Sequence, residues 1–420
     1  MSVEELFAEV AAAHPRCVWL DGGGAREWSG SRSLIGWLED DDVSLTYSAA
    51  RREVLRHSGG RSEVVGDDIW ETLEREVAPG EQWFGYLGYA CRTDLPATPS
   101  EDVPDAVWMR PSHVRMFDHG GVVRERTAYI PASNGQFATG LPRRAAYAAA
   151  FRQVQEALRA GDTYEANLTY RVTVHGAADP VETYLRLRSI NPAPYAGFLQ
   201  HDVAGHAAWL LSSSPERYAL IDEDRTIETR PIKGTTPRGA TAAEDAASAE
   251  LLRTDPKLRS ENLMITDLLR NDLAMVCEPG TVEVPGLMRV ESYPSVHQLV
   301  STVRGRLRDG ITTIEALRRL FPAGSMTGAP KLRTMEVIER AERELGGPRA
   351  AYAGAFGWIS GDGPADLGVI IRTVTTHDTH TWRIGTGGGI TVRSDVAEEA
   401  AEARLKADRV RASLGGSSNR

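Results

Sequence analysis

The sequence predicts an α+β fold, in which strands and helices occur in groups rather than in strict βαβ alternation. From Val18 to about Tyr129, short apolar runs such as Val43 to Tyr47 and Trp83 to Tyr89 alternate with clusters of Gly, Asp and Pro, as in strands joined by turns. Beyond Arg143, helical patterns separate further strand-like runs. With 420 residues, 41% of them hydrophobic, the chain can bury a large core.

The C-terminal region carries the clearest helical patterns. Within 143–160, apolar residues recur at spacings of four, three and four, and Gly161 follows the last of them. The predicted helices are Arg143 to Ala160, Thr241 to Leu252, Ser260 to Leu273, Thr313 to Leu320, Lys331 to Leu345 and Val396 to Leu414. The predicted strands are Leu168 to Val174, Ala207 to Leu211, Thr281 to Val284, His297 to Val303 and two more before the last helix.

A polar stretch divides the chain in two. Pro131 to Pro142 is rich in Ser, Asn and Gly, and is predicted to connect an N-terminal region (1–130) to a C-terminal domain (143–414). The last residues, 415–420, are polar and are expected to form a flexible tail.

Charge and cysteine content exclude several classes of protein. The formal net charge is −10, with a pI near 5.6, so there is no basic field to attract nucleic acid or an anionic membrane surface. The three widely spaced cysteines are typical of reduced thiols. No run approaches the roughly 20 apolar residues of a membrane helix, and Met1 to Ala13 carries three glutamates, unlike a signal peptide. We therefore expect a cytoplasmic protein with no nucleic-acid or membrane partner.

Two predicted helices carry acidic groups that could hold a metal. Glu261 falls in the first turn of the helix from Ser260, and Glu399, Glu402 and Lys406 share one face of the last helix. Taken alone, Glu261 is more typical of an acidic residue near a helix cap. The charged face of the last helix, taken alone, is more typical of a solvated ion-pair face. However, carboxylates one turn apart repel each other unless a cation joins them, and Mg²⁺ prefers oxygen ligands.

Two glycine-rich segments and a lysine segment could bind an anion. The run R-I-G-T-G-G-G-I includes Gly387 and Gly388, and F-P-A-G-S-M-T-G-A-P-K (321–331) precedes a helix; both could equally be simple turns. In P-I-K-G-T-T-P-R-G, Lys233 lies between Pro and Gly. Such a lysine is usually solvated, but one desolvated beside other cations would have a lowered pKa and a nucleophilic amine.

Other polar residues are weaker candidates. Arg238 and Arg372 are candidates for carboxylate recognition. His297 is either an acid or base, or a structural histidine.

Taken together, these segments resemble the chorismate-utilising family that includes anthranilate synthase component I, aminodeoxychorismate synthase component I, and the isochorismate and salicylate synthases. The motifs occur in family order over about 161–414: N-P-A-P-Y-A-G-F, S-S-P-E-R, P-I-K-G-T, S-E-N-L-M-I-T-D-L-L-R-N-D-L, V-H-Q-L-V-S-T-V, G-S-M-T-G-A-P-K, Y-A-G-A-F-G and the Gly-rich run. The N-terminal region matches only through L-D-G-G-G, S-R-S-L-I-G and G-Y-L-G-Y. The resemblance implies an anthranilate synthase component I-like fold, one interlocked unit with two packed layers of antiparallel sheet and helices outside.

The resemblance also implies a site. Glu261 and Glu402 would ligate Mg²⁺ directly and Glu399 through water, and the metal would hold the ring carboxylate of chorismate. The residues implied to line the site and bind the substrate are Thr327, Tyr352, Arg372, Gly387, Gly388 and Lys406.

Two positions favour one reaction within the family. Members that add water to carbon 2 carry a lysine at the position aligned with Ala166, and anthranilate synthases usually read P-I-A-G-T where this chain has Lys233. The resemblance therefore implies amination of chorismate to 4-amino-4-deoxychorismate, in which Lys233 attacks carbon 2, the carbon 4 hydroxyl leaves, and ammonia then replaces the lysine at carbon 4. The product would serve para-aminobenzoate and folate synthesis or a specialised aromatic-amine pathway.

The sequence departs from its relatives at two positions. Several relatives have a second histidine where Gln298 follows His297; glutamine can hydrogen-bond the leaving hydroxyl but cannot protonate it, so the acid stays open, with His297 a weak substitute. Leu258 replaces an outer carboxylate.

No G-x-C-x-G elbow surrounds a cysteine. Ammonia is therefore expected from a partner, a class I glutamine amidotransferase subunit.

Two alternatives remain. One is another amination within the family, giving anthranilate or 2-amino-2-deoxyisochorismate. The other is a catalytically silent regulator that binds an aromatic amino acid.

Overall fold

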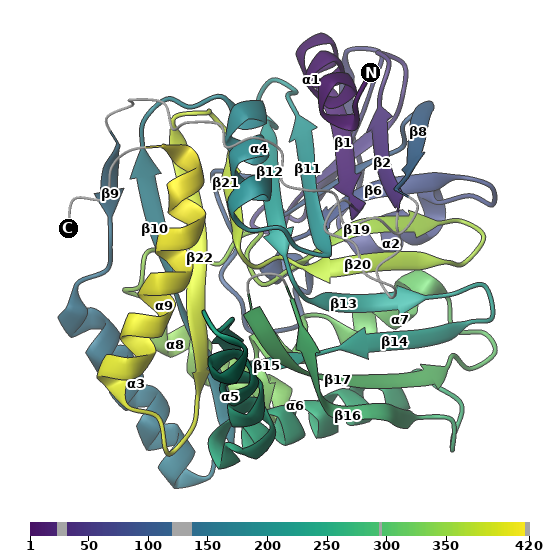
Figure 1. Cartoon of the computed structure of the whole chain (residues 1–420). Helices are drawn as coiled ribbons and strands as arrows, with labels where there is room; N and C mark the ends of the chain where they lie inside the picture. Colours follow the sequence, from purple (N-terminus) through teal and green to yellow (C-terminus); the bar gives the residue numbers. More distant parts are fainter. Residues whose placement is uncertain (23–31, 120–136, 294–295, 416–420) are drawn as a thin grey trace.

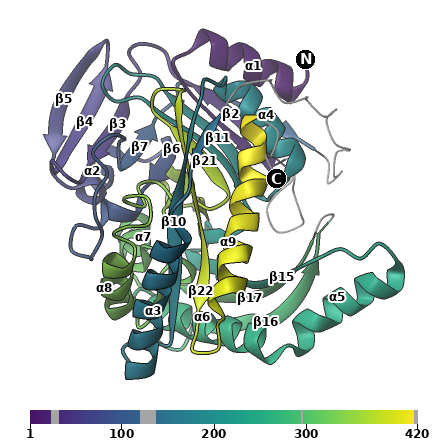
Figure 2. The ribbon, with the colours of Figure 1, turned by 90° about the vertical axis from the view of Figure 1, so that its left-hand side faces the viewer.

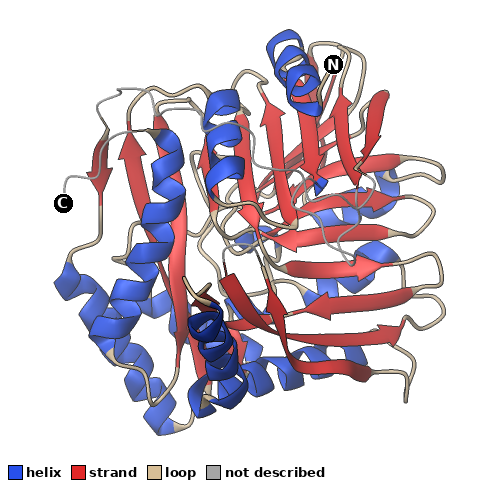
Figure 3. Ribbon diagram, in the orientation of Figure 1, coloured by secondary structure: helices blue, strands red, loops and turns tan. Residues whose placement is uncertain are grey.

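The protein is described by a computed structural model covering residues 1–22, 32–119, 137–293 and 296–415. Within these residues the strands form two sheets, and every pairing between strands is antiparallel. Figure 1 and Figure 3 show that the strands of one sheet cross those of the other, with helices outside both.

The first sheet contains ten of the described strands, in the order β18-β10-β22-β21-β12-β11-β1-β2-β8, with β9 also paired to β10. Their bounds are β1 (Arg16–Asp21), β2 (Arg32–Trp37), β8 (His113–Asp118), β9 (Ala138–Gly140), β10 (Glu165–His175), β11 (Tyr195–His201), β12 (Ala208–Ser214), β18 (Gly328–Ala329), β21 (Thr373–Thr376) and β22 (Thr381–Ile390).

The second sheet contains twelve of the described strands, in the order β15-β17-β14-β13-β20-β19-β6-β7-β3-β4-β5, with β16 also paired to β17. Their bounds are β3 (Ser44–Ser48), β4 (Glu53–Ser58), β5 (Arg61–Gly66), β6 (Gln82–Leu87), β7 (Ala106–Met109), β13 (Arg217–Ile221), β14 (Thr226–Arg230), β15 (Ile232–Pro237), β16 (Glu283–Ser292), β17 (Val296–Arg306), β19 (Ala355–Ser360) and β20 (Ala365–Val369).

The helices bury their apolar faces against the outer sides of the sheets. One core cluster joins the first sheet to α1, α3, α4 and α9, and another joins the second sheet to α2, α6 and α7. A third cluster, which includes Val18 and Phe84, fills the space between the sheets. The helices are α1 (Val3–Ala13), α2 (Ile69–Glu76), α3 (Arg144–Ala160), α4 (Pro180–Ile190), α5 (Ala242–Thr254), α6 (Pro256–Ala274), α7 (Thr313–Leu320), α8 (Lys331–Ala341) and α9 (Val396–Arg411).

The two halves of the chain share both sheets. In the first sheet β1 pairs with β11 from the later half, and in the second β6 pairs with β19. This confirms the prediction of one interlocked α+β unit. The division at 131–142 stays a prediction: residues 131–136 and the tail 416–420 lie outside the described residues, while 138–140 form β9, an edge strand of the first sheet.

Most of the predicted elements are present. The helix over 144–160 ends at Gly161, whose φ of 80° lies in the left-handed region that favours glycine. Three expectations were incomplete: α1, α2 and α4 were not predicted, the helix from Lys331 ends at Ala341, and four strands rather than two lie between it and α9.

The prediction for α6 was wrong at its N-terminus. This helix begins at Pro256, because Asp255 caps it by accepting from the backbone N–H of Leu258 at 2.9 Å. Glu261 therefore lies in the second turn of the helix, and its side chain is buried rather than placed at a cap.

Within the described part of the chain, no helix is long and apolar enough to cross a membrane.

Candidate functional site

A cavity of about 210 Å³ opens between the two sheets, bounded by β10, β22, β15, β17, α6 and α9. Figure 2 shows α9 running beside β22 along one side of this region. Ten of the twelve predicted site residues line the cavity: Lys233, Glu261, Gln298, Tyr352, Arg372, Gly387, Gly388, Glu399, Glu402 and Lys406. Residues that lie up to 173 positions apart in sequence, from Lys233 to Lys406, thus meet at one place.

Lys233 is directed into the cavity by an irregularity in β15. Ile232 pairs with Val300 but Thr235 pairs with Gln298, so β15 holds one extra residue between them. Gly234 allows this bulge, since its φ of 91° lies in the left-handed region. The lysine is therefore a buried strand residue, only 9% exposed, and not the solvated loop lysine that is usual for such a sequence.

The surroundings of Lys233 are acidic. Its Nζ donates a hydrogen bond to Glu165, which is 1% exposed. Burial alone would lower the pKa of Lys233, but the nearby carboxylates of Glu165 and Glu261 outweigh it and hold the pKa above its ordinary value. The prediction of a lowered pKa beside other cations was wrong, and the amine must lose a proton to a neighbour before it can act as a nucleophile.

Glu165 was missed by sequence reasoning. Successive residues of β10 point to opposite faces, so Ala166 packs in the apolar core whereas Asn167 lines the cavity. The argument from Ala166 therefore applies to a side chain that does not face the cavity. The neighbouring Glu165 contacts Lys233, and its Oε2 has no hydrogen-bond partner within the described residues.

Glu216 is a candidate for the acid that sequence reasoning left open. It lies in the S-S-P-E-R motif, lines the cavity and is 5% exposed. Burial raises its pKa to about 7, although the nearby Ser325 hydroxyl and the charge of Lys233 act in the opposite direction. A carboxyl that titrates near neutral pH can both donate and accept a proton there.

Glycine is required along β22 because side chains close in from several sides. A Cβ at Gly385 would lie 2.1 Å from the Tyr352 ring, and one at Gly389 would lie 2.4 Å from Glu165 Oε1. At Gly388 it would meet Glu399 Oε2 at 3.3 Å. The Gly-rich run therefore forms the cavity wall that faces both Lys233 and the acidic groups.

The three predicted metal ligands line the same cavity but differ in exposure. Glu261 and Glu399 are 8% and 5% exposed, whereas the side chain of Glu402 is 59% exposed. Burial raises the pKa of Glu261 to about 7, and the charge of Lys406, 2.8 Å from Glu402, lowers the pKa of Glu402. The predicted order of direct and water-mediated ligands stays a prediction.

A lysine that sequence reasoning missed lies among these carboxylates. Lys257 Nζ is 3.0 Å from Glu399 Oε1, and so joins α6 to α9. Burial alone would lower the pKa of Lys257. Its hydrogen bond to Glu399 and the charges of Glu261 and Glu402 outweigh burial, so the pKa of Lys257 is above its ordinary value. Leu258, the next residue, also lines the cavity.

The donor chemistry fits a hard divalent cation. Glu261 Oε1 is buried and has no hydrogen-bond partner among the described residues, although a buried carboxylate oxygen is expected to have one. Carboxylate oxygens from α6 and α9 line the same cavity. As the side chains stand, no three His, Cys, Asp or Glu residues in the described ranges are grouped closely enough to hold a metal ion. Ammonium groups instead pair with Glu399 and Glu402.

Arg372 gives the cavity lining a fixed positive charge. Arg372 lies in the left-handed region with a φ of 50°, unusual for a residue other than glycine, and its Nη1 donates to Asn191 Oδ1 at 3.3 Å. Burial, together with the charge of Arg409, lowers the pKa of Arg372 to about 10. It is still a cation at neutral pH and can pair with a substrate carboxylate, and so can Lys406.

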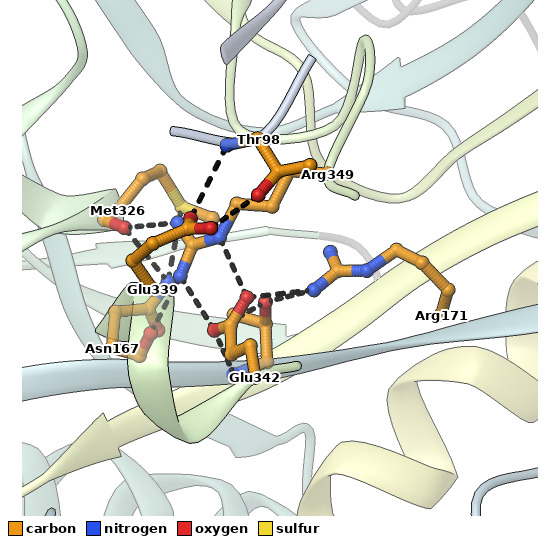
Figure 4. A network of polar contacts seen from close by, with 8 residues as sticks. Thr98, Asn167, Arg171, Met326, Glu339, Glu342 and Arg349 are labelled. Carbon is orange, nitrogen blue, oxygen red and sulfur yellow. Dashed lines mark hydrogen bonds and ion pairs between the residues drawn. The ribbon is translucent and has the colours of Figure 1, made fainter. Parts of the chain in front are cut away.

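A buried ion network supports the floor of the cavity (Figure 4). Glu342, which follows α8, accepts from Arg349 at 2.7 and 3.0 Å and from Arg171 at 3.0 Å. Arg349 also donates to the carbonyls of Met326 (2.7 Å) and Asn167 (2.9 Å), two residues that line the cavity. The network therefore fixes the backbone on which part of the site is built.

Two predicted site residues do not line the cavity. His297 faces away from the cavity because Gln298, the next residue of β17, faces into it. The imidazole of His297 lies 2.8 Å from Ser292 Oγ and 3.0 Å from Asp245 Oδ1. His297 is therefore a structural histidine. Thr327 is fully buried behind Met326, and its hydroxyl donates to the carbonyl of Gly324 at 3.2 Å.

Two weaker candidates also have structural partners. Arg238 makes two hydrogen bonds of 2.7 Å to Asp245, outside the cavity. Lys331 lies 2.7 Å from Asp272, so the basic residue after the second Gly-rich turn is paired within the fold.

Comparison with known proteins agrees with this geometry. The family model for chorismate binding enzymes matches residues 16–412. The chain belongs to this family. The anthranilate synthase component I of Streptococcus pneumoniae has the same fold, with a TM-score of 0.75 at 24% identity over 92% of this chain and 93% of that one. The menaquinone-specific isochorismate synthase of Escherichia coli gives a TM-score of 0.70 at 15% identity, over 99% of this chain and 91% of that one. The predicted anthranilate synthase component I-like fold is thereby confirmed.

Curated relatives within the family carry two different activities in their names. An aminodeoxychorismate synthase of Streptomyces pristinaespiralis is 37% identical over 97% of this chain and 63% of its own length. An aminodeoxychorismate synthase component 1 of Klebsiella aerogenes is 42% identical over 63% of this chain and 56% of its own. An anthranilate synthase component 1 of Streptomyces coelicolor is 40% identical over 86% of this chain and 80% of its own. The chain thus spans less than two thirds of the length of the first two.

Proposed function

We propose that this chain aminates chorismate to 4-amino-4-deoxychorismate, with Lys233 as a covalent nucleophile. The observation that carries the proposal is the position of Lys233, a buried amine on a strand bulge that faces a cavity lined by carboxylates. The relatives named aminodeoxychorismate synthase support the choice of reaction.

In the first step the chain prepares its own nucleophile. Because the pKa of Lys233 is raised, its amine is protonated at neutral pH. Glu165 already accepts a hydrogen bond from Lys233 Nζ, so it is the nearest base and takes this proton. The neutral amine attacks carbon 2, the ring double bond shifts, and the hydroxyl on carbon 4 leaves. Glu216, protonated below about pH 7, donates the proton that lets this hydroxyl depart as water.

The second step reverses the first with a new nucleophile. Ammonia attacks carbon 4, the double bond shifts back, and the bond between carbon 2 and Lys233 breaks. The lysine recovers a proton from Glu165, and the ammonium group formed on carbon 4 returns a proton to Glu216. The net change is chorismate plus ammonia to 4-amino-4-deoxychorismate plus water. No pyruvate is released.

Substrate binding follows from the charges that line the cavity. Chorismate carries two carboxylates, so an acidic protein needs local cations to hold it. Arg372 and Lys406 supply fixed positive charge, while Tyr352 and the backbone at Gly387 and Gly388 form the adjoining wall. Glu261, Glu399 and Glu402 would hold Mg²⁺, which neutralises a substrate carboxylate and the charge that develops during substitution.

Ammonia comes, in this proposal, from a class I glutamine amidotransferase that acts with the chain. Relatives named component 1 support the existence of a second component.

One experiment tests the reaction. The protein is incubated with chorismate, Mg²⁺ and ammonium, and the product is identified by mass spectrometry; 4-amino-4-deoxychorismate is expected. Without ammonium, the intact protein should gain the mass of chorismate less one water, and peptide mapping should place it on Lys233. Because the chain has only four lysines, this assignment is unambiguous.

Anthranilate synthesis is the second candidate. The match to the Streptomyces coelicolor anthranilate synthase component 1 favours this activity. That match covers 80% of the relative's length, whereas the match to the Streptomyces pristinaespiralis aminodeoxychorismate synthase covers 63%. Anthranilate is fluorescent and would be accompanied by pyruvate, so its appearance in the same incubation would overturn our assignment.

A further inference from the structure

The distribution of lysine in this chain is unusual. Of 48 lysines and arginines, only four are lysines, at positions 233, 257, 331 and 406. Three of the four line the same cavity, and the fourth, Lys331, pairs with Asp272 on α6. The chain therefore uses arginine for nearly all its surface cations and places three of its four lysines at the site. Lys233 and Lys406 have roles in the proposed reaction, but Lys257 has none.

Lys257 lies between the carboxylates proposed to hold the metal. It is the second residue of α6, one turn before Glu261 on the same helix face. Its ammonium crosses to α9, where it contacts Glu399 Oε1 at 3.0 Å. Lys257 thus links α6 to α9 through the carboxylate of Glu399. The proposed metal would link the same two helices and would use the same carboxylate.

Two cations held against one carboxylate repel each other, so they compete for it. Mg²⁺ binds oxygen ligands at about 2.0–2.1 Å in octahedral geometry, and it repels an ammonium group held against the same ligands. With Lys257 in place, Glu399 is occupied while Glu261 Oε1, one helical turn from Lys257, has no hydrogen-bond partner in the described part of the chain.

We propose that Lys257 is an internal counter-ion of the metal site: its ammonium occupies the acidic cluster in the metal-free protein, and Mg²⁺ displaces it. This inference rests on the proposed magnesium site. The lysine keeps Glu261 and Glu399 from repelling each other when no metal is bound, at the expense of weaker metal binding. A lysine suits this role better than an arginine, since its compact ammonium makes one contact that can be broken, whereas a guanidinium would bind a carboxylate through two parallel bonds.

The direct test measures metal binding without substrate or turnover. Mg²⁺ affinity is measured by calorimetry, and Mn²⁺ affinity by electron paramagnetic resonance, for the wild-type protein and for Lys257→Met, which keeps the chain length and removes the charge. We expect the variant to bind each metal at least about fivefold more tightly. Arg270→Met removes an exposed cation from the same helix, paired with Asp267 and remote from the cavity, and should change affinity less than about twofold.

The outcomes separate this inference from the metal site on which it rests. Equal or weaker binding by Lys257→Met would overturn the counter-ion role while leaving the metal site intact. Failure of every protein to bind either ion would reject both. Tighter binding by Arg270→Met as well would show a general charge effect and would also reject the inference.

A second readout uses the wild-type protein and does not depend on whether a variant folds. An amine-reactive reagent is applied with and without Mg²⁺, and the labelled lysines are quantified by peptide mapping. Displacement should increase labelling of Lys257 severalfold, with Lys331, paired to Asp272, as the internal reference. Labelling of Lys257 that Mg²⁺ leaves unchanged or decreases would contradict the proposal.

Discussion

Two buried charged clusters lie close together in this protein but differ in how their carboxylates are bonded. The framework cluster consists of Arg171, Glu342 and Arg349, all 7% exposed or less. The cavity cluster consists of Lys233 with Glu165, Glu216 and Glu261, all 9% exposed or less. In the first, both oxygens of Glu342 accept hydrogen bonds. In the second, Glu165 Oε2 and Glu261 Oε1 have no partner among the described residues.

The protonation of the two clusters follows from this difference. Burial raises the pKa of any carboxyl, but two guanidiniums more than offset it at Glu342, whose pKa is lowered. At Glu216 and Glu261 the compensation is incomplete, and burial raises both pKa values to about 7. Similar burial therefore has different results in the two clusters. Glu342 in the framework cluster stays ionised, whereas Glu216 and Glu261 in the cavity cluster can exchange protons near neutral pH.

The largest expected effect comes from removing the amine of the cavity cluster. Lys233→Ala should lower the rate of product formation from chorismate and ammonium by about 10³-fold or more, since no other lysine can form the covalent bond. Initial rates are followed by chromatography. Arg238→Ala, at the other end of the same segment and outside the cavity, is the matched control and should keep most of the activity. Full activity in Lys233→Ala would exclude a covalent lysine step.

The framework cluster should control stability. Glu342→Leu leaves two guanidiniums buried without their shared carboxylate and should lower the free energy of unfolding by about 3–5 kcal/mol. Chemical denaturation followed by circular dichroism measures this. Glu336→Leu, on the exposed face of α8, should change stability by less than about 0.5 kcal/mol. Similar small effects for both variants would contradict the role assigned to the network.

The smallest expected effect is a pH dependence at Glu216. Its pKa in the folded protein, about 7, is above its ordinary value of 4.5, so the folded state binds the extra proton between these two values. The stabilisation is full below about pH 4.5 and is lost as the pH rises through about 7, by roughly 2–4 kcal/mol. Glu216→Gln should remove this loss, so that the difference in stability from wild type grows between pH 5 and 8.

The control for this measurement is Glu223→Gln, at an exposed turn after β13. Its stability difference from wild type should not vary over the same pH range. A parallel pH dependence in wild type and Glu216→Gln would show that Glu216 does not titrate as proposed.

Several features could be predicted because short-range signals determine them. The stripe of apolar residues over 144–160 and the Gly161 that follows specified α3, and the spacing of Glu399, Glu402 and Lys406 placed them on one face of α9. The start of α6 was missed although its signal, Asp255 followed by Pro256, is also local.

Other features of the site had no local signal. Nothing in the sequence spacing indicates that Glu165 meets Lys233 or that Lys257 meets Glu399, because each contact joins elements distant in sequence. The same is true of the position of Glu216 in the cavity lining. Likewise, the choice between His297 and Gln298 depends on which face of β17 meets the cavity.

By itself, then, the sequence determined the family, the α+β class and most of the residues that gather at the cavity, since motif order and residue spacing are carried by the chain itself. Only the tertiary structure decided the charge environment of those residues: that Lys233 is surrounded by carboxylates, that Glu216 titrates near pH 7 and that Lys257 lies against a proposed metal ligand. The reason is physical, because pKa values and ion pairing depend on burial and on through-space distance to groups from other elements, neither of which a linear spacing contains.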